Sequence, residues 1–340
     1  MGFGLYAEQD FEEGEEILQE NPIATANLYV KEQTCGFCSK PLEKEAFECE
    51  YCKEEFYCCE SCRIQATHSF HRLVCNNKEA SLRMERMKGY LRFGIGQLCK
   101  LPILTCKLAG MELLSFFYKK ETRSSPLRNE EESDKEKQFT VDSFQHIQLL
   151  SSVSELYSFV EVWNLYRCFF HIASSFIPKQ ILNSKFDFRY FMDLTSKTST
   201  NGFKMDFPFL FSSSLPSPSP LPSPPSFFLS LQGIPLHQLD SSLPPTPSSK
   251  EGMAIFQLGN LLNHSCSPNA DFRVTHNIEH SNSPTKLTIL ASRKIKKGQQ
   301  IYTSYLPLES LSLPFLQRNQ ILAKSWGFDC NCSKCTLERN

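Results

Sequence analysis

Cysteine placement constrains this chain more than any other feature of its sequence. Fifteen cysteines occur among 340 residues, eight of them between positions 35 and 75 and three between 330 and 335. The first residues, MGFGLYAEQDFEEGEE, are acidic and lack the basic-then-apolar order of a secretory signal peptide. In a reducing compartment, clustered cysteines serve as metal-binding thiolates more often than as disulfides. We therefore expect zinc sites, and a protein of the nucleus or the cytoplasm.

The cysteine block at 35–75 contains enough ligands for two zinc ions. Tetrahedral zinc takes four thiolate or imidazole ligands, and a CxxC turn brings two sulfurs to one ion without strain. So short a segment has little core, and metal would supply much of its folding free energy. Cys59 and His68 are alternatives to Cys58 and His71. We prefer Cys58 and His71 because each completes a close pair with a cysteine. The four pairs are Cys35 with Cys38, Cys49 with Cys52, Cys58 with Cys62, and His71 with Cys75.

A third zinc site is indicated at the end of the sequence. Three cysteines in the segment CNCSKC need a fourth ligand to close a structural site, and they are Cys330, Cys332 and Cys335. Three other cysteines occur in apolar, helical stretches and are interpreted as core residues, namely Cys99, Cys106 and Cys168.

Cys266 is the remaining cysteine, and it lies in the polar segment NHSCSPN, two residues after His264. It could be a nucleophile that His264 activates, but the sequence shows neither an orienting acid nor an oxyanion loop beside it. We interpret Cys266 as the fourth ligand of the third zinc site, which would hold the C-terminal segment against NHSC.

The overall charge excludes several function classes. The net charge is −1, from 36 basic and 37 acidic residues, so the chain offers no bulk attraction for nucleic acid or an anionic membrane. No apolar run reaches the roughly 18 residues of a membrane helix. The cysteine block is nearly balanced in charge and lacks a basic recognition helix, so direct DNA binding is not favoured.

The pattern along the chain predicts both strands and helices. Short strands are expected within 1–30 and around the KKG turn at 296–298, and helices within 80–120, 140–183 and 312–324. The segment 204–250 contains LPSPSPLPSPPSFF and SSLPPTPSSK, which cannot form a regular helix or strand. We interpret it as a disordered insert whose PxxP runs could also bind a proline-reading module.

These pieces, in this order, resemble the SET and MYND domain (SMYD) family of protein lysine methyltransferases. The block at 35–75 is similar to the MYND zinc finger. NGF at 201–203, LLNHSCSPN at 261–269, GQQIYTSYL at 298–306 and FDCNCSKC at 328–335 resemble the SET core and post-SET motifs. The resemblance covers the chain except for the Pro/Ser-rich segment.

The resemblance implies an α+β fold: a SET-domain β-fold of small sheets, with knot-like threading near the active site, an inserted MYND finger, a helical insert and a zinc-binding post-SET tail. It implies that the finger ligands interleave, with Cys35, Cys38, Cys58 and Cys62 on one zinc and Cys49, Cys52, His71 and Cys75 on the other. Three Zn²⁺ ions are then expected in all. The implied divisions are 1–30 for the N-terminal part of the SET domain, 35–75 for the finger, 80–190 for the helical insert, 191–310 for the SET core and 311–340 for the tail.

The resemblance also implies a cofactor, S-adenosylmethionine, and a protein substrate with a target lysine, such as a histone tail. Tyr305 matches the tyrosine near the transferred methyl, with Tyr302 as its nearest rival. The other positions that match cofactor-binding residues are Gly2, Phe3, Gly4, Asn201, Asn263, His264 and Phe328.

Two positions differ from the family pattern. Phe3 stands where a polar or basic residue is common, and Gln300 replaces a usual glutamate. An alternative function is a catalytically weak MYND scaffold that binds proline-rich partner peptides. The matching residues at the expected cofactor site favour the enzyme.

Overall fold

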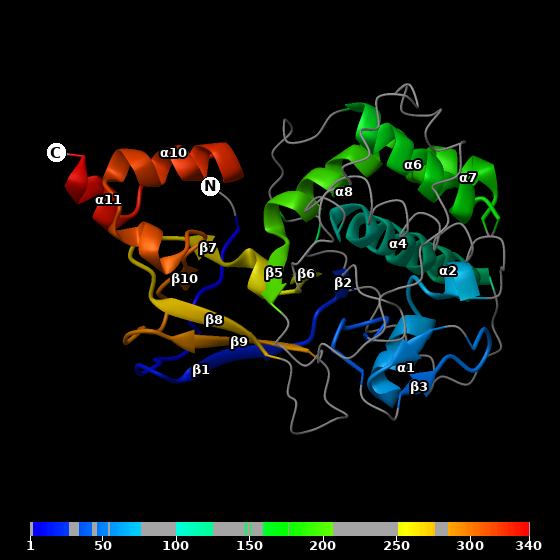
Figure 1. Ribbon diagram of the computed structural model, residues 1–340, viewed down its shortest axis with the longest axis horizontal. Helices are drawn as coiled ribbons and strands as arrows, with labels where there is room; N and C mark the ends of the chain where they lie inside the picture. The colour runs from blue at the N-terminus through cyan, green and yellow to red at the C-terminus, as the bar shows by residue number, and fades with distance from the viewer. Residues whose placement is uncertain are drawn as a thin grey trace, which may run out of the picture.

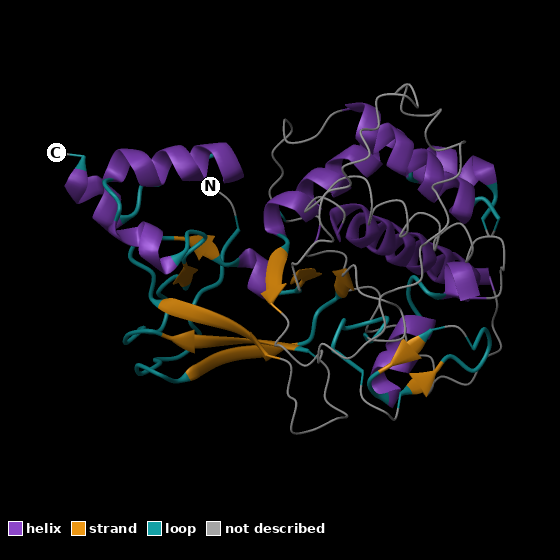
Figure 2. Cartoon of the chain, viewed as in Figure 1, coloured by secondary structure: helices purple, strands orange, loops and turns teal. Residues whose placement is uncertain are grey.

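The computed structural model describes residues 3–26, 34–42, 46–53, 55–75, 100–124, 147, 150, 159–175, 177–206, 251–275 and 285–339. The helices between residues 100 and 201 gather on one side of the molecule, whereas the main β-sheet and the two C-terminal helices lie on the other (Figure 1). Strands are short throughout and are joined by long loops (Figure 2). Residues 204–206 of the expected disordered insert belong instead to a β-strand that pairs with 251–253, so the predicted insert began too early. The rest of the insert (207–250), Gly2 and Cys99 lie outside the described residues. Of the described helices, none is both long and apolar enough to cross a membrane.

Three small sheets form the β part of the molecule. β1 (Glu16–Glu20) pairs antiparallel with β9 (Lys286–Ala291), which pairs antiparallel with β8 (Ala270–Thr275). β6 (Glu251–Ile255) lies between β2 (Ala24–Ala26) and β5 (Phe203–Asp206) in a second antiparallel sheet. β7 (Asn263–His264) and β10 (Tyr302–Thr303) form a two-stranded parallel pair. The expectation of small SET-type sheets is thus confirmed.

The β part has its own apolar core. On β9, Leu287, Ile289 and Ala291 alternate with less buried residues, as expected for a strand with one face covered. These side chains pack with Phe256, Leu262 and Ile301 from the segments that approach β7 and β10. The parallel pair is therefore anchored to the main sheet by shared packing.

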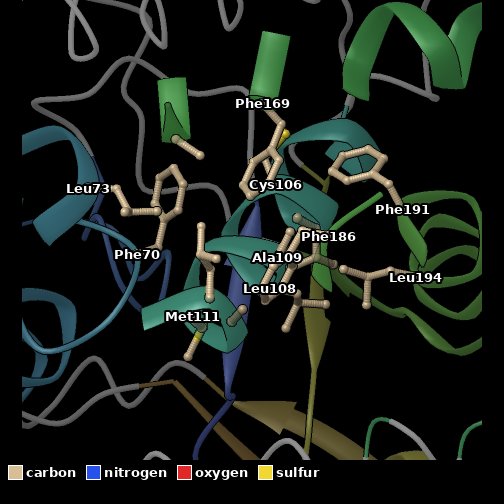
Figure 3. Packing of buried hydrophobic residues seen from close by; sticks show 14 of the residues in the cluster. Phe70, Leu73, Cys106, Leu108, Ala109, Met111, Phe169, Phe186, Phe191 and Leu194 are labelled. Atoms are coloured by element: carbon tan, nitrogen blue, oxygen red, sulfur yellow. The ribbon is translucent and has the colours of Figure 1, made fainter. Parts of the chain in front are cut away.

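The helical part contains α4 (Lys100–Ser124), α6 (Phe159–Ala173), α7 (Lys179–Lys185) and α8 (Phe188–Asn201). The apolar faces of α4, α6 and α8 meet in a core that includes Leu108, Phe169 and Phe191 (Figure 3). Cys106 is fully buried there, as expected for a core cysteine. Asp187 caps α8 by accepting a hydrogen bond from the Tyr190 backbone N–H, at 2.8 Å.

A compact cysteine-rich finger precedes α4. Its elements are β3 (Phe47–Glu48), β4 (Phe56–Tyr57), α1 (Glu60–Thr67) and α2 (Arg72–Cys75). The finger is joined to the rest of the molecule through Thr25 on β2, whose hydroxyl donates to the Phe37 carbonyl at 2.6 Å. Lys107 of α4 donates to the carbonyls of Thr25 and Gly36, at 2.8 and 3.0 Å. The finger, β2 and α4 are therefore held together by a shared set of hydrogen bonds.

The C-terminal part carries two 3₁₀ segments and two helices. η4 (Gly259–Leu261) leads into β7, and η5 (Leu308–Ser312) follows β10. α10 (Phe315–Trp326) and α11 (Ser333–Glu338) close the chain. Gly327 ends α10 in the left-handed region, at φ 70°, where glycine carries no Cβ penalty. That turn directs the chain from α10 toward Phe328 and Cys330.

Candidate metal centres and cofactor site

The first metal centre lies in the finger and is made of Cys35, Cys38, Cys58 and Cys62, all buried. The Sγ atom of Cys58 lies 3.5 Å from that of Cys38 and 3.7 Å from that of Cys62. Cys62 projects from α1, while Cys35 and Cys38 lie in a turn closed by the Ser39 N–H bond to the Cys35 carbonyl, at 2.9 Å. The turn therefore supplies two thiols, α1 supplies one, and Cys58 comes from the segment between β4 and α1.

The second centre is made of Cys49, Cys52, His71 and Cys75. His71 Nε2 lies 3.3 Å from Cys49 Sγ and 3.5 Å from Cys52 Sγ, and Cys49 Sγ lies 3.4 Å from Cys75 Sγ. The two ligand sets interleave along the chain, in the arrangement that the family resemblance implies. Cys59 and His68, the sequence alternatives, belong to neither set.

The third centre joins two distant parts of the chain. Cys266, directly after β7, meets Cys330, Cys332 and Cys335, and all four Sγ atoms lie within 4.8 Å of one another. Cys266 Sγ lies 4.0 Å from Cys330 Sγ and 3.5 Å from Cys335 Sγ. The tail is thus held against the segment that carries Asn263 and His264.

These distances fit zinc. Four sulfurs at about 2.3 Å from a tetrahedral ion lie roughly 3.8 Å from one another. The Sγ pairs of the first and third centres span 3.5–4.0 Å. Each centre offers four soft or borderline ligands and no carboxylate, which is the donor set of a closed structural zinc site. Three Cys/His clusters able to bind zinc are therefore present, in positions consistent with MYND and post-SET sites.

His264 does not activate Cys266 as a base would. The Tyr305 backbone N–H donates to His264 Nδ1 at 3.0 Å, so the ring proton is assigned to Nε2, which lies 3.3 Å from Cys266 Sγ. Burial, and then the charge of Arg318, lowers the pKa of His264 to about 4. The neutral ring therefore donates a hydrogen bond to the sulfur, as expected beside a metal-bound thiolate.

Burial raises the pKa of the Cys266 thiol to about 11. At neutral pH the free thiol would hold its proton, so a zinc ion is what would make it a thiolate. Both observations count against the nucleophile alternative.

Asn269 holds together the parallel β7–β10 pair and the chain segments that meet it, a region called here the β7–β10 crossing. Its side chain accepts from the Tyr302 backbone N–H at 2.7 Å and donates to the Gln300 carbonyl at 2.9 Å. On the other side of the same segment, residues 5–7 pair with 299–301, through the Ala7 N–H bond to Gln299 O at 2.9 Å and the Ile301 N–H bond to Leu5 O at 2.8 Å. Three chain segments far apart in sequence thus run together at this point.

The N-terminal loop touches this crossing. Asn263 Nδ2 donates to the Phe3 carbonyl at 3.0 Å. A methyl group added to Gly4 would lie 2.1 Å from Gln300 Nε2 and 2.7 Å from Asn263 Nδ2. A side chain at this position would therefore have to displace the ends of the Gln300 and Asn263 side chains. Of the predicted cofactor residues, Phe3, Gly4 and Asn263 are in one place.

Asn201, at the end of α8, joins this site through a residue that sequence reasoning missed. The Asn260 side chain donates to the Asn201 carbonyl and accepts from the Phe256 backbone N–H. Asn260 is buried and lies three residues before Asn263. A buried polar residue beside the LLNHSC segment was the available signal, but its partner comes from 59 positions earlier in the chain.

Aromatic rings form the other side of the site. The centroid of Tyr305 lies 5.3 Å from that of His264 and 6.2 Å from that of Phe328, and His264 and Phe328 are 6.0 Å apart. Trp326, which was not predicted, lies 5.5 Å from Tyr305. Phe328 lies two residues before Cys330, so the third centre holds this ring close to Tyr305 and His264.

Tyr305 is distinguished from Tyr302 by its surroundings. A single strand running through both tyrosines would point them to opposite faces. β10 ends at Thr303, however, so Tyr305 lies beyond the strand and this rule does not separate the two. The Tyr305 hydroxyl donates to the Leu262 carbonyl at 2.7 Å, whereas the Tyr302 hydroxyl donates to Gln300 Oε1 at 2.6 Å. Burial raises the pKa of Tyr305 to about 12, so its phenol stays protonated at neutral pH.

A SET-domain family profile matches residues 2–306 of this sequence, a span that contains the crossing, the N-terminal loop and Tyr305. The chain belongs to the SET-domain family. The SET profile ends just before η5, so α10, α11 and the last three cysteines form a tail beyond it.

Curated relatives match a shorter part of this SET-domain chain. It is 36% identical over 92 residues to Histone-lysine N-methyltransferase set5 of Schizosaccharomyces pombe, covering 26% of this chain and 25% of that protein. It is 37% identical over 86 residues to Histone-lysine N-methyltransferase ATXR2 of Arabidopsis thaliana, covering 25% and 16%. It is 40% identical over 84 residues to human Protein-lysine N-methyltransferase SMYD4, covering 25% and 9%. The matches thus span a quarter or less of each relative.

Proposed function

We propose that this SET-domain protein is a protein-lysine N-methyltransferase that uses S-adenosylmethionine. The carrying observation is the convergence of Phe3, Gly4, Asn263, Tyr305 and Phe328 around the β7–β10 crossing. The names of the relatives set5, ATXR2 and SMYD4 support the same reaction class. Histone tails are the first substrates to test because two of these names specify histone lysine.

The residues at the crossing fit a small polar cofactor beside aromatic rings. The cofactor supplies an electrophilic methyl group on a sulfonium. The loop at Gly2–Gly4, together with Asn201, Asn263 and His264, would hold its polar parts, and Phe328 would contact its adenine. Gly4 supports this assignment, because a side chain there would collide with Asn263.

The chain's own contribution to the reaction is positioning. The target lysine must arrive as a neutral amine, which a desolvated aromatic environment favours. Tyr305 and Trp326 supply such rings. The Tyr305 phenol, held by the Leu262 carbonyl and protonated at neutral pH, would orient the amine and the methyl group, not remove a proton.

We further propose that the finger and tail centres hold three zinc ions, with the twelve ligands named above, and that the domain divisions follow the SET and MYND pattern. The proposed location is the nucleus or the cytoplasm, because histone-lysine methyltransferases are among the relatives.

Calorimetry of the purified chain with S-adenosylmethionine tests the proposed function. We expect one site per chain, and transfer of a labelled methyl group to a histone-tail peptide or to a lysine-containing protein mixture. The variant Gly4→Ala should weaken cofactor binding, because its methyl would displace Asn263. Gly14→Ala, which strains a turn with φ 87° but places no atom within 4 Å of the added methyl, should lower stability and keep cofactor affinity. Absence of cofactor binding by the wild-type chain would contradict the enzyme proposal.

A second candidate function is a scaffold that binds proline-rich peptides at the finger. The finger exposes apolar side chains, with Tyr51 at 66%, Ile64 at 47% and Phe47 at 37%. Aromatic surfaces of this kind accept preformed polyproline helices. Titration of the chain with a proline-rich peptide, followed by the fluorescence of a label beside Tyr51, separates this function from methyl transfer.

A further inference from the structure

Arg318 is the most deeply buried large side chain beside the third metal centre. It projects from α10, and its side chain is 1% exposed. Burying a guanidinium away from water carries a large desolvation cost unless opposite charge compensates it. Its buried position therefore requires a nearby negative charge.

Its hydrogen-bond partners include thiols of that centre. Arg318 Nη2 lies 3.3 Å from Cys335 Sγ, and the guanidinium also contacts the Cys266 side chain. Cys266 comes from the SET core and Cys335 from the tail, so the guanidinium bridges the two halves of the ligand set. The neighbouring Asn319 accepts from the Cys330 backbone N–H at 2.6 Å. α10 therefore surrounds the centre with donors.

Oxygen acceptors account for only part of the hydrogen bonding of this arginine. Arg318 Nη2 donates to Glu338 Oε2 at 2.9 Å, but the Glu338 side chain is 37% exposed and needs no buried partner. Nη1 donates to the Leu313 carbonyl, and Nε has no hydrogen-bond partner among the described residues.

A charge count explains the arrangement. Zn²⁺ with four thiolates carries a net charge of about −2, which is costly to bury. One guanidinium within hydrogen-bond distance of a ligand sulfur offsets part of that charge. Without a charged metal site, Glu338, whose side chain is 37% exposed, would be its one anionic partner among the described residues.

We propose that Arg318 is a positioning residue of the post-SET metal site, setting its zinc affinity by donating hydrogen bonds to the ligand sulfurs from a buried guanidinium. This inference rests on the proposed third zinc. Through Cys266 and the tail it also determines how firmly Phe328 is held, but its direct effect is on the metal.

Zinc competition with a chromogenic chelator tests it on the full chain. Wild type should release three metals, and Arg318→Gln should weaken one of the three sites roughly 10- to 100-fold, as removal of outer-shell partners does at other metal sites. Cobalt substitution should show a changed thiolate-to-metal charge-transfer band for that one site. Arg318→Lys keeps the charge but loses the planar set of donors. Its zinc affinity at the third site should lie between those of wild type and Arg318→Gln.

Two matched variants separate charge on the thiolates from other roles. Arg339→Gln removes the same charge from the same tail, where the guanidinium stacks on Phe315 at 5.0 Å, and should leave all three affinities unchanged. Glu338→Gln breaks the salt bridge but leaves the guanidinium on the sulfurs, so it should keep or tighten the third site. Damage by Glu338→Gln equal to that by Arg318→Gln would make Arg318 a tail salt-bridge residue and overturn the proposal.

The other possible outcomes also test the proposal. Unchanged affinity in Arg318→Gln would contradict the proposal, as would parallel loss of all three metals in both Arg318→Gln and Arg318→Lys. Only two metals in the wild type would remove the third site and this inference together. Cofactor binding measured on the same preparation would then show whether the proposed methyltransferase function survives independently.

Discussion

At the scale of single residues, Tyr305 is the side chain whose chemistry is most directly testable. We expect Tyr305→Phe to lower turnover, or to change the number of methyl groups added, while cofactor affinity stays nearly unchanged. Loss of one hydrogen bond made in the transition state costs about 1.5–3 kcal/mol, which is roughly a 10- to 100-fold loss of rate. Single-turnover methyl transfer and calorimetry measure the two quantities separately.

Tyr302→Phe is the control for Tyr305→Phe, because its hydroxyl bonds Gln300 and not Leu262. Equal rate losses in both variants would indicate general destabilisation of β10. A loss confined to Tyr302→Phe would reverse the assignment.

At the scale of elements, the segment that leads into β7 depends on a carboxylate from another strand. Glu20, at the end of β1, accepts backbone N–H bonds from Gln257 and Leu258, both at 3.1 Å, and from Gly259 at 2.5 Å. Bonds to a charged group contribute about 1.5–3 kcal/mol, so Glu20→Gln should lower the free energy of unfolding by an amount of that order. Urea titration measures the change.

The same variant should weaken cofactor binding, because η4 carries Asn260 and precedes Asn263. Glu16→Gln, an exposed position on the same strand, makes the same change of charge and serves as the control. Similar destabilisation by both variants would mean that Glu20 acts only through the net charge of β1.

At the scale of the whole molecule, the finger and the SET core are expected to unfold together. The first metal centre is tied to β2 by the Thr25 hydroxyl, and Lys107 links both to α4. Cys38 also accepts a backbone hydrogen bond from Thr285, directly before β9. Cys62→Ser should therefore lose protection of β2 and β6 amides against hydrogen exchange, whereas Cys52→Ser, in the second centre, should affect mainly the finger. If Cys62→Ser and Cys52→Ser caused equal loss of protection in β2 and β6, this coupling would be contradicted.

Deletion of residues 208–248 should leave the fold intact. Asp206 of β5 pairs with Glu251 of β6, so the two ends of the segment are already neighbours in an antiparallel hairpin. Each halving of a flexible loop lowers its closure cost by about 0.6 kcal/mol, so a three-residue connection should keep or slightly raise the melting temperature. Calorimetry that showed no cooperative transition after the deletion would establish a structural role for the segment.

Sequence alone determined the metal-ligand candidates and the family, because both depend on local spacing. CxxC-type pairs and motifs such as NHSCSPN are local, so they can be recognised without knowledge of the fold. The same holds for the Gly4 position and for Tyr305, which were predicted as part of motifs. The positions of Cys58 rather than Cys59, and of His71 rather than His68, followed from the same spacing.

Only the tertiary structure decided which distant side chains complete the site. Glu20, Asn260 and Arg318 have no local signature, since each has a partner far along the chain: Gly259 is 239 positions from Glu20, Asn201 is 59 from Asn260, and Cys335 is 17 from Arg318. The direction of the His264–Cys266 hydrogen bond also needed the Tyr305 backbone, 41 residues later. A motif states which atoms a site can offer, whereas burial and long-range hydrogen bonds, which depend on the complete fold, determine how those atoms are held and charged.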